Sequence, residues 1–228
     1  MARVTNATAP RPDVSELIAV HGVFRDTLGA APKLVGGVAP GESERLALVA
    51  NYYDNILFFL EAHHDGEEEI VFPALRDRCP DQQALLDRLD AEHKEAIALL
   101  TTAQGSLAAW AGGDSAAGDA VVDDLGALRT QLVTHLDREE SDALPLCEAN
   151  LSVEEWGSLS GHGMANFHGD KIWLILGLIR ERMSEAQRTA MLEHMPPPAV
   201  EMWTGMGEQA FKDLSDQVVV EVTTRVST

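Results

Sequence analysis

Six residues of two types stand at matched spacings that suit a metal site. They are His21, His63, Glu67, His93, His135 and Glu139. The first two histidines are 42 residues apart (63 − 21), and the last two are also 42 apart (135 − 93), so a shift of 72 carries one pair onto the other. A His and a Glu four residues apart lie one turn apart on the same helical face and can serve one centre.

The 72-residue shift extends beyond the candidate ligands. HHDGEEEIVFP, which begins at His63, recurs from His135 as HLDREESDALP, a shared pattern of H-x3-E-E-x4-P. Apolar residues precede each copy at alternating steps of three and four, the spacing of one helical face that is turned to a core. We expect this inward face to continue past the glutamates through Ile70 and Ala74 in the first copy, and through Asp142 and Leu146 in the second. The pattern predicts two copies of one helical hairpin.

The turn residues predict how these helices are arranged. In antiparallel helices, residues equidistant from the connection lie level with each other. The midpoints between successive histidines are residues 42, 78 and 114, and each falls in a segment rich in Pro, Gly or Asp, at 39–43, 76–81 and 112–115. The prediction is an all-α, up-down-up-down four-helix bundle with its four histidines in one layer. Pro32 predicts a kink or break near Ala31.

Inward histidines and glutamates require a compensating partner. Buried without one, each charged group would cost several kcal/mol, and a bound cation removes that cost. Two carboxylates that face each other across the bundle can bridge a pair of metals. Because the set mixes imidazole with carboxylate and contains no thiolate, it favours iron or manganese over copper or a structural zinc.

These motifs resemble the hemerythrin-like, HHE cation-binding family over residues 13–149. The resemblance implies two iron ions, a pair that an oxo or hydroxo group can bridge, with manganese or zinc as weaker candidates. It implies four terminal histidine ligands, with Glu67 and Glu139 bridging the metals. It also implies O2, H2O2 or NO as the small-molecule ligand.

Two positions depart from oxygen-carrying hemerythrin. Ile97 stands where that protein has a second third-helix histidine, which argues against reversible O2 carriage. The fourth-helix carboxylate there is an Asp at i+5, whereas this chain has Glu139 at i+4 and Glu140 at i+5. Three further residues are additional candidates for contact with the metal or with its ligands: His64, Glu68 and Glu140. For His64 two interpretations stay open, a fifth ligand or an outer residue, and so does the alternative register His64/Glu68.

The remaining sequence bounds the organisation of the chain. We expect a flexible N-terminus at 1–12, the bundle at 13–149, and a helical extension at 150–228 that packs on the bundle. A net charge of −20 argues against nucleic acid as a partner. With no signal-like or spanning apolar run, and with only Cys79 and Cys147, we expect a cytoplasmic chain without a membrane segment.

Three functions remain open at this stage. The first is a di-iron protein that binds or reduces O2, peroxide or NO, in defence or sensing, with catalase-like turnover as its enzymatic form. The second is a di-iron oxidase or oxygenase whose organic substrate lies in a pocket closed by the C-terminal helices. The third is a non-catalytic iron sensor or store. His162 and His168 are candidates for residues that line access to the site.

Overall fold

The computed structural model describes residues 10–114 and 116–224, with side chains up to residue 218. Most of the predicted flexible N-terminus (1–9), Ser115 in the third predicted turn, and residues 225–228 lie outside this part. The described residues form helices and turns, with no strand among them. The predicted all-α fold is therefore confirmed.

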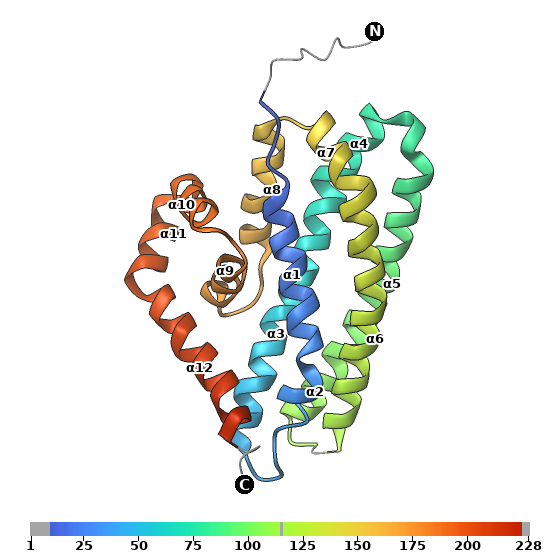
Figure 1. Ribbon diagram of the computed structural model, residues 1–228. Helices are drawn as coiled ribbons and strands as arrows, with labels where there is room; N and C mark the ends of the chain where they lie inside the picture. Colours follow the sequence, from blue (N-terminus) through green and yellow to red (C-terminus); the bar gives the residue numbers. More distant parts are fainter. Residues whose placement is uncertain (1–9, 115, 225–228) are drawn as a thin grey trace.

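Four long helices form an up-down-up-down bundle (Figure 1). They are α1 (Ser15–Gly29), α3 (Ser43–Gly66), α5 (Gln83–Ala111) and α6 (Ala117–Arg138). Helix α5 packs along α6, α3 packs on α5, and α1 packs on α6. Each buries one apolar stripe, as amphipathic helices of this length do.

The predicted breaks fall where the chain turns. Helix α1 ends at Gly29, and a short separate helix α2 (Ala31–Leu34) carries Pro32 in its first turn, where the missing N–H costs nothing. Gly41 and Gly113 adopt φ values of +91° and +101°, a left-handed conformation that glycine reaches without strain. The 3₁₀ turn η2 (Pro80–Gln82) joins the two hairpins.

The inward stripe shifts by one residue just after each glutamate. A π-helical turn begins at each of them, η1 (Glu67–Val71) and η3 (Glu139–Ala143), and is followed by α4 (Phe72–Arg78) and α7 (Leu144–Asn150). A π turn holds one extra residue, so the predicted inward positions were wrong beyond this point. Asp142 is exposed, and Ile70, Ala74 and Leu146 are only partly buried. The buried residues are Val71, Phe72 and Leu75 in the first copy and Ala143, Leu144 and Cys147 in the second.

Proline explains where these π turns occur. Pro73 and Pro145 each stand in the first turn of the helix that follows, where a proline is tolerated. Within a continuous α-helix each would lack its hydrogen bond and would clash with the carbonyl four residues earlier. The wider turn instead closes with i+5 bonds, from Phe72 N–H to the Glu67 carbonyl and from Leu144 N–H to the Glu139 carbonyl.

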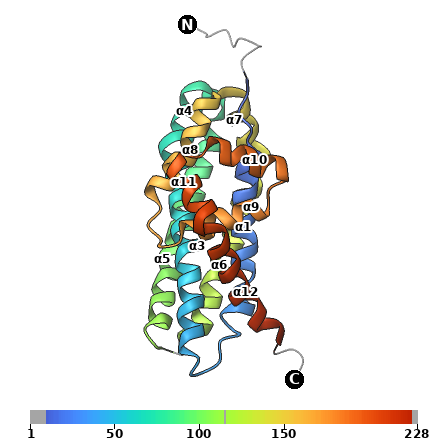
Figure 2. The same cartoon turned by 90° about the vertical axis from the view of Figure 1, so that its left-hand side faces the viewer.

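The C-terminal segment covers one side of the bundle. It contains α8 (Val153–Asn166), α9 (Ile172–Glu181), α10 (Glu185–His194), α11 (Pro197–Met202), the π turn η4 (Trp203–Gly207) and α12 (Glu208–Thr224). Capping boxes at Ser152 and Ser184 begin α8 and α10. Helix α8 packs on α3, and α9 packs on both α1 and α3 (Figure 2).

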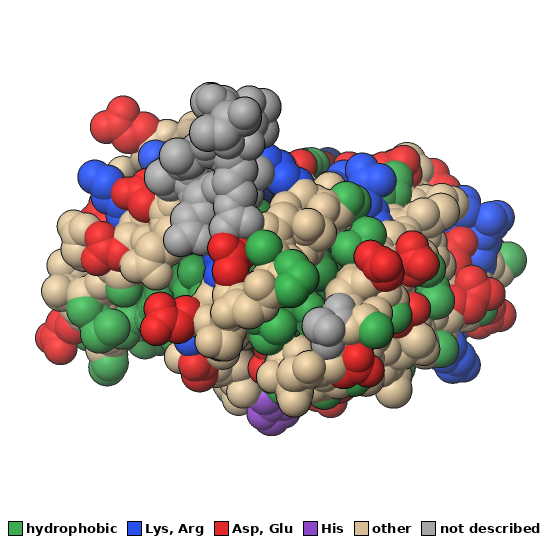
Figure 3. Space-filling view, turned by 90° about the horizontal axis from the view of Figure 1, so that it is seen from below, with side chains coloured by type: hydrophobic (Ala, Val, Ile, Leu, Met, Phe, Trp, Pro, Cys, Tyr) green, Lys and Arg blue, Asp and Glu red, His purple; other side chains and the backbone are tan. Residues whose placement is uncertain are grey.

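Acidic and basic side chains are interspersed on the lower end of the molecule rather than gathered into one patch (Figure 3). Among the residues the structure describes, no helix combines the length and apolar character needed to cross a bilayer.

Candidate metal centre

The six predicted ligands come from six elements and converge inside the bundle. His21 lies on α1 and His93 on α5, and His63 lies in the last turn of α3, which is followed by Glu67 at the start of η1. His135 and Glu139 repeat the last arrangement at the end of α6. All six are buried, with at most 6% of any of them exposed. The structure therefore brings together every residue of the predicted set.

The side chains form two adjacent groups of possible metal ligands. His64, His93 and His135 make the first group, called the three-histidine group below. The second group contains two histidines and two carboxylates: His21, His63, Glu67 and Glu139. Within each group the ligand atoms lie within 4.8 Å of one another, a separation that one cation can span.

The two glutamates lie between the groups. Oε1 of Glu67 lies 3.4 Å from His63 Nε2, and its Oε2 lies 3.4 Å from His93 Nε2. Each oxygen of this carboxylate thus faces a different group. Oε2 of Glu139 lies 3.4 Å from His21 Nε2 and 3.7 Å from His135 Nε2. Each carboxylate therefore lies within 3.7 Å of a histidine nitrogen from each of the two groups.

His64 belongs to the cluster together with His63. Its ring is 1% exposed and stacks on that of His93, with centroids 4.2 Å apart. The two neighbouring histidines therefore serve different groups, since His63 faces His21 at 5.2 Å between ring centroids. The registers His63/Glu67 and His64/Glu68 are therefore not alternatives, because both histidines are buried in the cluster. Ile97, which stands where oxygen-carrying hemerythrin has a histidine on the third helix, is 38% exposed. The third histidine of the first group is instead His64, which lies on α3.

Several buried polar atoms in the cluster have no hydrogen-bond partner. They are Nε2 of His21 and His63, both ring nitrogens of His64, both oxygens of Glu67, and Oε2 of Glu139. Unpaired buried polar atoms are rare in proteins because each costs about 1–3 kcal/mol. A cation in each group would satisfy all of these atoms except one ring nitrogen of His64, so the donor set fits a pair of metal ions.

The contact between His93 and His135 supports the same conclusion. Nδ1 of His93 lies 3.2 Å from Glu68, and Nδ1 of His135 lies 3.3 Å from Glu92. An ionised carboxylate can only accept, so each Nδ1 donates its proton to the facing glutamate. The two Nε2 atoms are 3.1 Å apart. When both rings are neutral, each Nε2 carries a lone pair, and the two repel each other unless a proton or a metal ion lies between them.

Three outer carboxylates orient the histidines. Besides Glu68 and Glu92, Glu140 accepts from His21 Nδ1 at 2.9 Å, and Arg25 donates to the same oxygen at 2.6 Å. Burial pushes the pKa of Glu140 upward, but hydrogen bonds from His21 and Arg25 outweigh burial and lower it. Partners of this kind fix the tautomer of a ligating histidine. Glu68 and Glu140 therefore each contact a histidine of the cluster.

Glu92 was missing from the predicted set. It accepts from Arg88 and Arg138 as well as from His135, so it links α5 to α6. Burial acts to raise the pKa of Glu92, and these hydrogen bonds lower it overall. Its position one residue before His93 gave no periodic signal, because the contact is made across helices.

Burial sets the protonation of the cluster in the absence of a cation. It raises the pKa of Glu67 to about 8, and burial together with the nearby Glu67 raises the pKa of Glu139 well above 4.5. It lowers the pKa of His63 and His64 well below 6.5, and that of His135 to about 3. In the metal-free state these five groups are thus driven toward neutral carboxyls and neutral imidazoles. Bound cations would instead favour the ionised form of the two carboxyl groups.

The C-terminal segment approaches the cluster at Gly66. A Cβ atom there would lie 2.8 Å from Leu159 and 3.2 Å from His162, so the missing side chain permits the close approach of α8. Nδ1 of His162 lies 3.7 Å from Glu69, and the ring of His168 packs edge-on to Phe58. Neither histidine belongs to a metal-ligating group.

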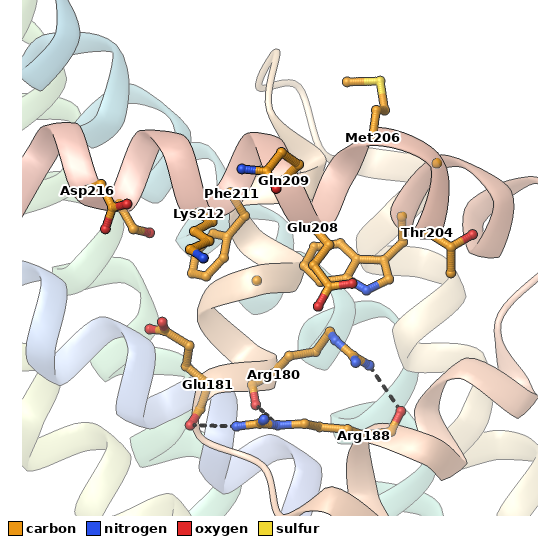
Figure 4. A pocket seen from close by; sticks show the side chains of 14 residues that line it. Arg180, Glu181, Arg188, Thr204, Met206, Glu208, Gln209, Phe211, Lys212 and Asp216 are labelled. Carbon is orange, nitrogen blue, oxygen red and sulfur yellow. Dashed lines mark hydrogen bonds between the residues drawn. The ribbon is translucent and has the colours of Figure 1, made fainter.

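A pocket of about 570 Å³ lies within the C-terminal segment (Figure 4). Helices α9, α10 and α12 and the turn η4 supply its walls, and Arg180 lies over the Trp203 ring at 5.1 Å. Arg188 donates to the carbonyls of Arg180 and Glu181 and so caps the end of α9. The lining includes none of the cluster residues.

Comparison with known proteins agrees with the geometry. The family model of the hemerythrin HHE cation-binding domain matches residues 13–147, which is more than half of the chain. A search of curated proteins gave no match, and a search of solved structures gave none either. The matched region contains all four bundle helices and every residue of the cluster. The chain belongs to the hemerythrin HHE cation-binding domain family.

Proposed function

We propose that this protein holds two iron ions and uses them to bind or reduce a small oxidant: O2, peroxide or nitric oxide. His64, His93 and His135 would hold one ion, and His21 and His63 would hold the other. Glu67 and Glu139 lie between the two groups and would supply carboxylate oxygens to both.

The observation that carries this proposal is the orientation of Glu67. Its two oxygens face different histidine groups at the same distance of 3.4 Å, and neither has a hydrogen-bond partner. A carboxylate buried only for packing would be paired with a donor. A carboxylate that bridges two cations would direct one oxygen toward each ligand group and leave both oxygens without a hydrogen-bond donor, as in Glu67.

The ligand set supports iron, and the surroundings support small ligands. Imidazole with carboxylate favours iron or manganese over metals that prefer thiolates. Phe24 lies 5.3 Å from the His63 ring and Phe72 lies 5.1 Å from the His93 ring, so apolar side chains border both groups. Iron would supply the redox chemistry, while this chain excludes bulk water and orients His21, His93 and His135 through their outer carboxylates.

The two other functions considered from the sequence have less support. An oxygenase would need an organic substrate beside the ions, and the pocket of Figure 4 contacts no cluster residue. A store or sensor needs only occupancy, which the same ligands provide. Reactivity of the loaded protein separates this last function from the proposed one.

Iron content tests the site. We expect anaerobic loading with Fe(II) to give two ions per chain and Glu67→Ala to reduce this to one or fewer, because the bridge holds both ions. Glu95→Ala, which removes an exposed carboxylate from α5, serves as the matched control and should keep two. Fewer than two ions in the unaltered protein would contradict the proposal, as would two in Glu67→Ala.

Exposure to the three oxidants tests the chemistry. Rapid loss of peroxide would mark a catalase-like activity, and a lasting optical change with O2 or nitric oxide would mark binding or sensing. If iron-loaded protein responds to none of the three, the function is storage or structural.

A further inference from the structure

The pocket of Figure 4 has the size and the apolar floor of a small-molecule site. Its volume of about 570 Å³ falls within the range of about 300–1,000 Å³ that such sites occupy. The rings of Trp203 and Phe211 line it, with centroids 6.5 Å apart, and are themselves 3% and 8% exposed. The π turn η4 supplies part of the wall, and π turns are frequent at functional sites.

Two arginines meet in this pocket and hold each other in place. Arg180 donates from Nη1 to the carbonyl of Arg188 at 3.0 Å, and Arg188 donates from Nε to the carbonyl of Arg180 at 2.6 Å (Figure 4). The Arg180 guanidinium also lies over the Trp203 ring, whose face attracts a cation. Each guanidinium has five N–H donors, and these contacts use only some of them.

Neither arginine has the carboxylate partner that a partly buried cation normally requires. Both side chains are partly buried. Among the side chains that the structure describes, up to residue 218, neither forms an ion pair, whereas Arg25 and Arg76 each do. Burial lowers the pKa of Arg180, nearby Glu208 offsets this only in part, and Arg188 adds to it. Two adjacent cations without a partner inside a pocket indicate a place for the anionic group of a ligand.

Carboxylates stand instead at the mouth of the pocket. Glu181, Glu208 and Asp216 line it, and all three are exposed, unlike the two arginines. Lys212 is the exposed cation beside them. The mouth is therefore negative on balance, as is the whole chain at −20. A ligand with two negative charges would be repelled on its approach, whereas a positive outer end would be attracted.

We propose that this pocket binds a small zwitterion, a molecule with a carboxylate at its inner end and an ammonium group at its outer end. The carboxylate accepts from the guanidiniums of Arg180 and Arg188, whose planar donor sets suit it. The apolar middle of the ligand lies along Trp203 and Phe211, and the ammonium group faces the carboxylates at the mouth. This site goes beyond the proposed function and does not require metal, because the pocket contains no cluster residue.

Calorimetric titration of the full chain tests the proposal. The probes are three zwitterions of increasing length: glycine, γ-aminobutyrate and ε-aminocaproate. Each is compared with the acid that lacks the amino group, namely acetate, butyrate or caproate, and the dianions succinate and adipate are titrated as well. We expect at least one zwitterion to bind at one per chain, about fivefold more tightly than its matched acid. This ratio is what a solvent-exposed ion pair contributes.

Variants at the two ends of the pocket should act differently. Arg180→Met keeps much of the side chain's length but removes its charge, so it should weaken the zwitterion at least about tenfold. Arg129→Met removes an exposed arginine from α6 and is the matched control, which should bind as the unaltered protein does. Replacing the three mouth carboxylates together, by Glu181→Gln, Glu208→Gln and Asp216→Asn, should abolish the preference for the zwitterion over its acid.

Several outcomes would overturn the proposal. They are no binding of any of the three zwitterions, unchanged affinity in a folded Arg180→Met, and tighter binding of succinate or adipate than of the zwitterions. If Arg180→Met does not fold by circular dichroism, the triple variant still decides, because its three side chains are exposed. A preference for the zwitterion that survives the triple exchange also overturns the proposal. Metal-free protein serves for every titration, so a failure of the proposed function leaves these results unaffected.

Discussion

Removing the metal should make the stability of this protein fall as pH rises above neutral. The prediction follows from Glu67, whose pKa rises from 4.5 to about 8 on burial. Between these values the folded state holds a proton that the unfolded state has released. Stability is therefore lost as pH increases through this range. Glu139, with its raised pKa, acts in the same direction.

The histidines act in the opposite direction but mainly at lower pH. His63, His64 and His135 have lowered pKa values in the folded state, so the unfolded state binds more protons below about 6.5. Their contribution to stability rises with pH and is almost complete above neutral pH. The carboxyls then dominate, and the metal-free protein should be most stable at slightly acidic pH.

The size of the loss follows from the slope of about 1.4 kcal/mol per pH unit for each proton. From about pH 7 to about pH 8.5 the metal-free protein loses about 1.3 kcal/mol of stability through Glu67. Glu139 adds to this loss because its pKa is raised as well, and the histidines return only a small part of it. For a chain of this size, a loss of about 1.3 kcal/mol lowers Tm by roughly 3–5 °C. With iron bound, both carboxylates are already ionised, and the loss should disappear.

Thermal unfolding followed by circular dichroism measures this loss of stability. Protein freed of metal with a chelator is compared with protein loaded anaerobically with Fe(II), each at both pH values. Glu67→Gln is the matched control, because the amide keeps the shape and cannot ionise. Its metal-free form should lose about 1.3 kcal/mol less over the same pH range. A metal-free protein whose Tm is flat or rises with pH would refute the reasoning, as would an unchanged slope in Glu67→Gln.

Three further predictions concern the ligands and the cover. His63→Ala and His64→Ala should each weaken one cation only, so that iron titrations show one tight and one weak site; two tight sites in His64→Ala would exclude it as a ligand. Glu140→Ala should lower the affinity for the cation beside His21 and His63 by about 10- to 100-fold, because His21 loses the partner that orients it, whereas Glu148→Ala at an exposed site should leave this affinity unchanged. Gly177→Ala should destabilise the fold by about 1–3 kcal/mol in urea unfolding, because the new Cβ would lie 2.2 Å from Phe211, while iron content stays at two; an unchanged midpoint would show that α9 and α12 separate easily.

Much of the bundle could be predicted from local patterns. The 72-residue repeat placed four histidines in one layer, and Pro and Gly marked the turns, because both signals arise from helix geometry and backbone sterics. The register beyond Glu67 and Glu139 could not be predicted from a constant helical period. A π turn adds a residue there, and only the prolines at 73 and 145 hinted at it.

The sequence by itself determined the fold, the repeat and the six residues that converge. Tertiary structure alone decided how they divide into two groups, because that division depends on which helix packs against which. Helix α3 lies against α5, which brings the ring of His64 onto that of His93. Glu92 reaches His135 for the same reason, across the interface of α5 and α6. Contacts between helices have no period along the chain, so no spacing in the sequence records them.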